Sequence, residues 1–145
     1  MFEVWTLVRF LHVLSAMVWV GGQLTITAML LPVVRARLAA GDRAEVMRHV
    51  GRRFGLFTLV VFLPVQVSTG VLLAWQHGVT FASLLSPGYG RTLLAKLIVV
   101  ALVLAASGVH GWAQGTARAE LARAFAIGSL LGSLVIVLLA TALAA

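Results

Sequence analysis

The sequence predicts an all-α, polytopic membrane protein, a single domain over residues 1–145 that forms a four-helix transmembrane bundle. Hydrophobic side chains make up 61% of the 145 residues and charged ones only 10%, with a mean hydropathy of +1.07. A soluble domain carries about a quarter charged residues. No β-barrel alternation is visible, and each helix satisfies its own backbone in lipid. The apolar runs, each long enough to cross a ~30 Å hydrocarbon layer, cover about residues 4–31, 54–76, 92–113 and 124–144.

The first run is expected to begin near Phe2 and to end before Pro32, because proline does not continue a helix. Its length and its scattered polar residues argue against a cleaved signal peptide. The segment 32–53 then contains a short amphipathic stretch over residues 42–50, with Asp42 as a plausible N-cap.

The second run, 54–76, contains Pro64 in mid-span, which predicts a kink. An external loop over residues 78–90 leads to the third run, which starts near Arg91. The fourth run carries small residues four apart, a spacing that allows close helix packing: Gly128, Ser129, Gly132 and Ser133.

Basic residues are concentrated at one end of the predicted helices. One side of the membrane holds Arg35, Arg37, Arg43, Arg48, Arg52, Arg53, Arg118 and Arg123, and the other holds Arg9, Arg91 and Lys96. Positive loops face the cytoplasm, so both termini are expected outside it, on the periplasmic side of a bacterial inner membrane. The arginines are explained by topology and anionic lipid, and no nucleic-acid partner is expected.

The residue inventory excludes several chemistries. The chain contains no cysteine, which excludes disulfides, thiolate metal sites and iron–sulfur clusters. Its four carboxylates all lie outside the deep membrane, which argues against a proton-driven carrier. No hydrolytic constellation or glycine-rich phosphate loop is present.

Polar residues follow one face of each of the first three predicted helices. Helical spacing aligns Trp5, Arg9, His12, Ala16, Trp19 and Gln23 on the first, Gln66, Thr69, Gln76 and His77 on the second, and Lys96, Val100, Val103, Ser107, His110 and Gln114 on the third. Polar groups are costly in lipid, so these faces are expected to meet at a polar centre, where His12 and Lys96 share one depth.

Imidazole nitrogen binds both haem iron and copper. His12, Lys96 and His110 are therefore candidate cofactor-binding residues, with Arg9 and Arg91 placed to pair with haem propionates. The candidate metal ligands are His12, His77 and His110. His49 lies in the basic segment and is a weaker candidate. The alternative for His12 is a hydrogen bond to Gln66 or Thr69 across the helices.

Three segments carry a resemblance to a known family. "LHVLSAMVWVGG", "RRFGLFTLVVFLPVQVSTGVLLAW" and "YGRTLLAKLIVVALVLA" resemble, in this order, the first three helices of the CopD-like (copper-resistance protein D) membrane family. A partial resemblance extends to HemJ-type protoporphyrinogen oxidases, at His12, Trp19, Gly21–Gly22 and Lys96. In that group the histidine and the lysine are implicated at a b-type haem, although this chain lacks its acidic loop and extended C-terminal region.

The function is left open between three classes. The resemblance to the CopD-like family implies copper handling, by uptake or delivery across the membrane through a His-lined seam. The alternative is a haem b protein in electron transfer or in oxidation of a membrane-soluble substrate, with His12 as axial ligand. The third class is a membrane subunit that binds a partner protein and whose polar helix faces only determine how its helices pack. Expected partners are the bilayer and a metal ion or haem, with a homo-oligomer also open.

Overall fold

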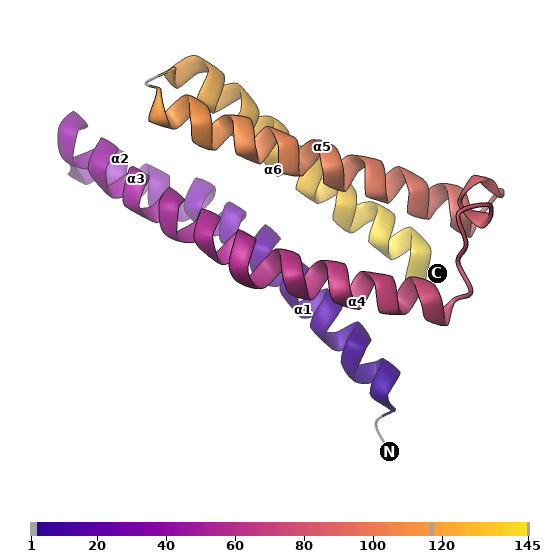
Figure 1. Cartoon of the computed structure of the whole chain (residues 1–145). Helices are drawn as coiled ribbons and strands as arrows, with labels where there is room; N and C mark the ends of the chain where they lie inside the picture. The colour runs from indigo at the N-terminus through magenta and orange to yellow at the C-terminus, as the bar shows by residue number, and fades with distance from the viewer. Residues whose placement is uncertain (1–2, 117, 145) are drawn as a thin grey trace. The chain divides into compact units, whose positions relative to one another are not determined.

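A computed structural model describes residues 3–116 and 118–144 and confirms the all-α fold class. Over these residues the chain forms helices and no strand. Four helices in this part of the chain are long and apolar enough to cross a membrane. The chain divides between Gly78 and Val79 into two compact units, each an antiparallel helical hairpin (Figure 1).

The first hairpin consists of two long rods joined at Leu38 and Ala39. One rod contains α1 (Val4–Thr25), the π-helical η1 (Ile26–Leu30) and α2 (Leu31–Arg37). The other contains α3 (Ala40–Phe57), the π-helical η2 (Thr58–Phe62) and α4 (Leu63–Gln76). The predicted end of the first helix before Pro32 is therefore wrong, and the segment 32–53, in which the sequence predicts only a short amphipathic stretch, is mostly helix. Ala39 is the N-cap of α3, and Asp42 lies in its first turn.

Both prolines follow a π-helical turn, which explains why neither ends its rod. The N–H of Leu31 donates to the carbonyl of Ile26, and the N–H of Leu63 donates to that of Thr58, each five residues back. Proline has no N–H, and its ring collides with the carbonyl four residues earlier in a regular α-helix. The wider turn relieves that collision, so the helix continues through Pro32 and Pro64.

The second hairpin pairs α5 (Tyr89–Gly115) with α6 (Ala119–Ala144). The short 3₁₀ helix η3 (Ser83–Leu85) precedes α5 in the predicted external loop. Gly88 caps α5 with a φ of 84°, a left-handed conformation that glycine adopts without strain. Both helices extend beyond the predicted 92–113 and 124–144.

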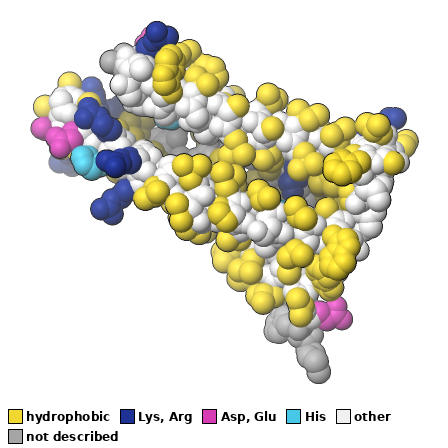
Figure 2. Space-filling view, viewed as in Figure 1, with side chains coloured by type: hydrophobic (Ala, Val, Ile, Leu, Met, Phe, Trp, Pro, Cys, Tyr) yellow, Lys and Arg dark blue, Asp and Glu magenta, His cyan; other side chains and the backbone are white. Residues whose placement is uncertain are grey.

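The outer faces of the helices are apolar. Figure 2 shows hydrophobic side chains spread along the rods, while Lys and Arg gather at the end where α2 and α3 meet. Two of these exposed hydrophobic side chains are Leu59, which is 66% exposed, and Met29, which is 68% exposed. Such faces suit contact with lipid acyl chains. Together with the four helices of membrane length, they identify a multi-pass membrane protein.

Candidate functional site at His12

The interface between α1 and α4 is built in layers. Near the N-terminus, Trp5 meets Trp75 edge-on, with ring centroids 6.2 Å apart. Further along α1, Trp19 stacks on Phe62 of η2, with ring centroids 4.6 Å apart and an interplanar angle of 11°. Both of these rings are buried. Between the two aromatic layers lies the His12 cluster, which we define as His12, Ser15, Gln66 and Thr69.

Both ring nitrogens of His12 are hydrogen-bonded across the two helices. Nδ1 lies 2.8 Å from Oγ1 of Thr69, and Nε2 lies 3.1 Å from Nε2 of Gln66. The hydroxyl of Ser15 lies 2.5 Å from Oε1 of Gln66 and 3.0 Å from the carbonyl oxygen of His12. The interhelical partners expected for His12 from the sequence are thus the ones that it contacts.

The hydrogen-bond directions define the tautomer of His12. The hydroxyl of Thr69 donates its single proton to the carbonyl of Val65, 2.5 Å away. Oγ1 of Thr69 must therefore accept from His12, which places a proton on Nδ1. The Nε2 lone pair then accepts from the amide nitrogen of Gln66, whose Oε1 accepts from Ser15. In this arrangement Nδ1 of His12 donates to Thr69, and Nε2 is the nitrogen that faces the Gln66 amide.

Gly70 makes room for the imidazole. A Cβ at this position would lie 3.2 Å from Cε1 of His12 and 3.8 Å from Nδ1. The ring is therefore packed directly against the backbone of α4, which explains how His12 reaches the hydroxyl of Thr69 one residue earlier.

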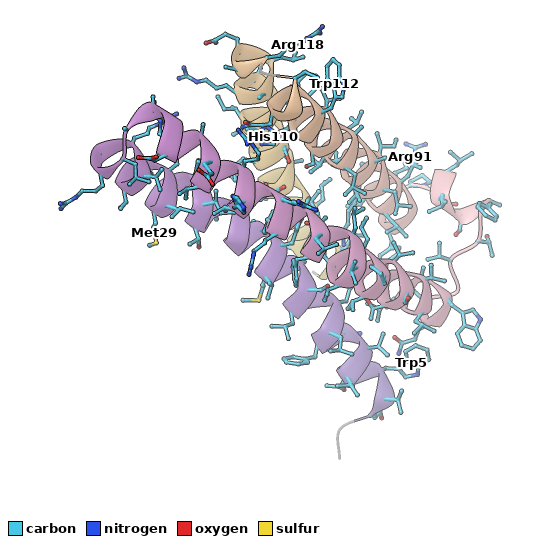
Figure 3. All side chains as sticks on the ribbon, turned by 60° about the vertical axis from the view of Figure 1, so that its left-hand side comes forward. Trp5, Met29, Arg91, His110, Trp112 and Arg118 are labelled. Atoms are coloured by element: carbon cyan, nitrogen blue, oxygen red, sulfur yellow. The ribbon has the colours of Figure 1, made fainter. Side chains whose placement is uncertain are left out.

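The other histidines have local partners. Nδ1 of His77 donates to the carbonyl of Leu73 at 2.7 Å, and Nδ1 of His49 donates to that of Glu45 at 3.1 Å, both on exposed helix surfaces. His110, labelled in Figure 3, projects from α5 and donates from Nδ1 to the carbonyl of Ala122 on α6, at 2.7 Å. The described residues contain no group of three or more His, Asp or Glu side chains that could surround one metal ion.

The charged candidates lie on both hairpins. Arg9 is exposed on α1, one turn before His12, and Lys96 is half-buried on α5. Arg91 is exposed and donates from Nε to the carbonyl of Leu85 at 3.2 Å. The predicted pairing of His12 with Lys96, and the roles of Arg9 and Arg91 at propionates, stay predictions.

The polar face of α5 packs against α6. Oγ of Ser107 lies 2.8 Å from Oγ of Ser129, and the buried Val103 lies against Gly132. Ser133 is fully buried and donates to the carbonyl of Ser129 at 2.8 Å. Ser129, Gly132 and Ser133 therefore serve the close packing that the spacing predicted, whereas Gly128 is exposed and a Cβ there would meet no atom within 4 Å.

Ser15 of the His12 cluster and the adjacent Gly70 escaped the sequence reasoning. Ser15 stands one turn after His12, and its spacing of three residues was a usable signal. Gly70 had no such signal, because only the approach of a neighbouring helix gives a glycine there its role.

Comparison with known protein families, with curated proteins and with solved structures found no match.

Replacing Thr69 by valine is expected to destabilise the first hairpin by about 1 kcal/mol, because the shape is kept but the Nδ1–H of His12 loses its acceptor. Thr6 is exposed on α1, so Thr6→Val is the matched control and should leave stability unchanged. Unfolding in detergent micelles by added SDS, followed by circular dichroism, measures the difference. Equal stability of the two variants would contradict the hydrogen bond.

Proposed function

We propose that this chain is a bacterial inner-membrane protein, with both termini on the periplasmic side, that binds a b-type haem through His12. The haem would supply one-electron chemistry, either for electron transfer or for oxidation of a membrane-soluble substrate. The observation that supports this is the tautomer of His12, with the proton on Nδ1 held by Thr69. Ligating histidines usually have their other ring nitrogen anchored by such a bond.

The local chemistry fits a single-imidazole ligand better than a multi-histidine cage. A haem iron needs one axial imidazole from the protein, whereas a closed copper site needs several donors at one place. To expose Nε2, the amide of Gln66 must turn away from His12. Ser15 has a second acceptor for its hydroxyl in the carbonyl of His12, at 3.0 Å, so release of Gln66 leaves that hydroxyl bonded.

Absorption spectroscopy tests the proposal. The full chain, purified from haem-replete cells, is expected to show a Soret band, and His12→Ala is expected to lower the haem content at least about tenfold. His49→Ala is the matched control, because His49 is an exposed histidine on α3, and should keep the band. Lys96→Gln tests the ligand expected from the sequence, by a changed spectrum. A colourless wild-type protein would refute the haem.

Copper handling is the second candidate, and it is supported by a feature common to several histidines. His12 and His77 of the first hairpin each donate from Nδ1, as does His110 of the second, so in each ring Nε2 is the nitrogen that would bind copper. Near-stoichiometric copper without a Soret band, lost in His12→Ala, would favour it. If His12→Ala changes neither haem nor copper content, the cluster serves packing in a partner-binding subunit, and light scattering in micelles then tests for a homo-oligomer.

A further inference from the structure

We propose that the loop before α5, residues 79–88, is a membrane anchor that inserts Phe81 and Leu85 among the phospholipid headgroups and upper acyl chains of the nearest bilayer surface. The proposal concerns the second hairpin alone and holds whether or not the protein binds haem or copper.

The loop is apolar and carries no charge. Phe81 is 94% exposed and Leu85 is 69% exposed. Residues 78–90 contain no Asp, Glu, Lys, Arg or His. Tyr89, the first residue of α5, is also exposed, and tyrosine is enriched where a membrane meets water. An uncharged loop that exposes two large apolar side chains is suited to an apolar environment rather than to bulk water.

The backbone of the loop forms its own hydrogen bonds, as a segment that enters lipid requires. The N–H of Thr80 donates to Oγ of Ser83 at 2.8 Å, and the N–H of Ser83 donates to Oγ1 of Thr80 at 3.2 Å. The N–H groups of Leu84 and Ser86 donate to the carbonyls of Thr80 and Ser83. These bonds lower the cost of placing η3 among headgroups, because fewer backbone groups must lose water without a partner.

The loop is fixed against the first turn of α5. Gly90 is buried, and a Cβ at this position would overlap the carbonyl oxygen of Ser83. Arg91 donates from Nε to the carbonyl of Leu85 and from its backbone N–H to that of Ser86, both at 3.2 Å. Because the loop already has a defined conformation, its insertion loses little conformational freedom.

The length of α5 places the loop at a membrane boundary. Near the other end of α5, Trp112 is 53% exposed and lies under the guanidinium of Arg118, 4.9 Å from its carbon to the ring centroid (Figure 3). An exposed tryptophan beside an arginine is typical of the membrane–water boundary. A hydrocarbon layer of ~30 Å takes about 20 helical residues. Counting about 20 residues back from Trp112 reaches Thr92, so η3, which packs on Gly90, lies at the opposite boundary.

Spin-label spectroscopy tests the insertion. The chain contains no cysteine, so one introduced cysteine carries a single nitroxide label. Ala82→Cys places the label at an exposed position between Phe81 and Leu85 and keeps both side chains. The full chain is reconstituted in nanodiscs of phosphatidylethanolamine and phosphatidylglycerol. Collision of the label with oxygen, which concentrates in acyl chains, and with a water-soluble nickel chelate then gives its depth.

The label at position 82 is expected within about 5–10 Å of the bilayer surface, at the boundary between headgroups and acyl chains. Two reference labels calibrate this depth. Glu3→Cys, at a charged and exposed residue before α1, serves as the reference for water. Leu102→Cys, at a residue that is 63% exposed in the middle of α5, serves as the reference for acyl chains.

A second substitution tests whether Phe81 holds the loop in the membrane. Phe81→Ser, combined with Ala82→Cys, should lower the ratio of inserted to water-exposed label about tenfold, because the phenyl ring no longer gains from burial in lipid. Phe10→Ser is the matched control: Phe10 is 57% exposed on α1, and its replacement should leave the label at position 82 at its original depth.

Three results would overturn the proposal. A label at position 82 that collides with nickel as often as the Glu3→Cys label lies in water, as a surface that awaits a partner protein would. A label shielded from both oxygen and nickel is packed against the chain itself. Equal depths in the Phe81→Ser and Phe10→Ser variants would show that Phe81 does not hold the loop in the bilayer.

Discussion

Replacing Trp19 by alanine is expected to destabilise the first hairpin by about 3–5 kcal/mol. Trp19 is only 4% exposed and stacks on Phe62, which is 5% exposed. The substitution removes this contact and leaves a cavity that neither the helices nor lipid fill well, because dispersion contacts stabilise helix pairs in membranes. SDS-induced unfolding in micelles, followed by circular dichroism, measures the loss.

Trp75→Ala provides the control for this substitution. Trp75 is on the same hairpin, is 73% exposed and meets Trp5 only by an edge, so its replacement should cost far less. Trp19→Phe keeps an aromatic ring against Phe62 and should recover much of the stability. If Trp19→Ala and Trp75→Ala unfold at the same SDS fraction, the stacked pair does not hold α1 against η2.

Replacing Gly132 by alanine is expected to destabilise the second hairpin by about 1–3 kcal/mol through overpacking. A Cβ on Gly132 would overlap Cγ2 of Val103, a residue that is 3% exposed between α5 and α6. The helices must then separate, or Val103 must leave its rotamer, and either change weakens the contacts around Ser107 and Ser129. Thermal unfolding in micelles measures the effect.

The same helix offers both a control and a rescue. Gly128 lies one turn earlier, and a Cβ there meets no atom within 4 Å, so Gly128→Ala should leave stability nearly unchanged. Val103→Ala removes the colliding methyl and leaves a Cβ 3.7 Å from the new one, an ordinary contact. The double variant should therefore be more stable than Gly132→Ala alone. Additive losses in the double variant would show that the collision is not the cause.

The membrane-spanning character of the helices was predictable, but their ends were not. Uninterrupted apolar runs are a local property, so the sequence located the four helices of membrane length in the described part of the chain. The sequence did not predict that the first rod continues through Pro32 to Arg37. A π-helical turn accommodates the proline, and no residue pattern in 26–30 indicates such a turn. The sequence also did not predict that most of the basic segment forms the helix α3. Arginine has a high helix propensity, so a charged segment can be helical outside lipid.

By itself the sequence determined that the protein is all-α, that four helices can cross a membrane, and that His12 shares a helical face with other polar groups, because these depend on residue type and spacing along one chain. Only the tertiary structure decided that His12 binds Thr69 and Gln66, that Ser15 joins them, and that Gly70 admits the ring. Those features depend on how closely two helices approach and at what register, which is set by the packing of both faces together.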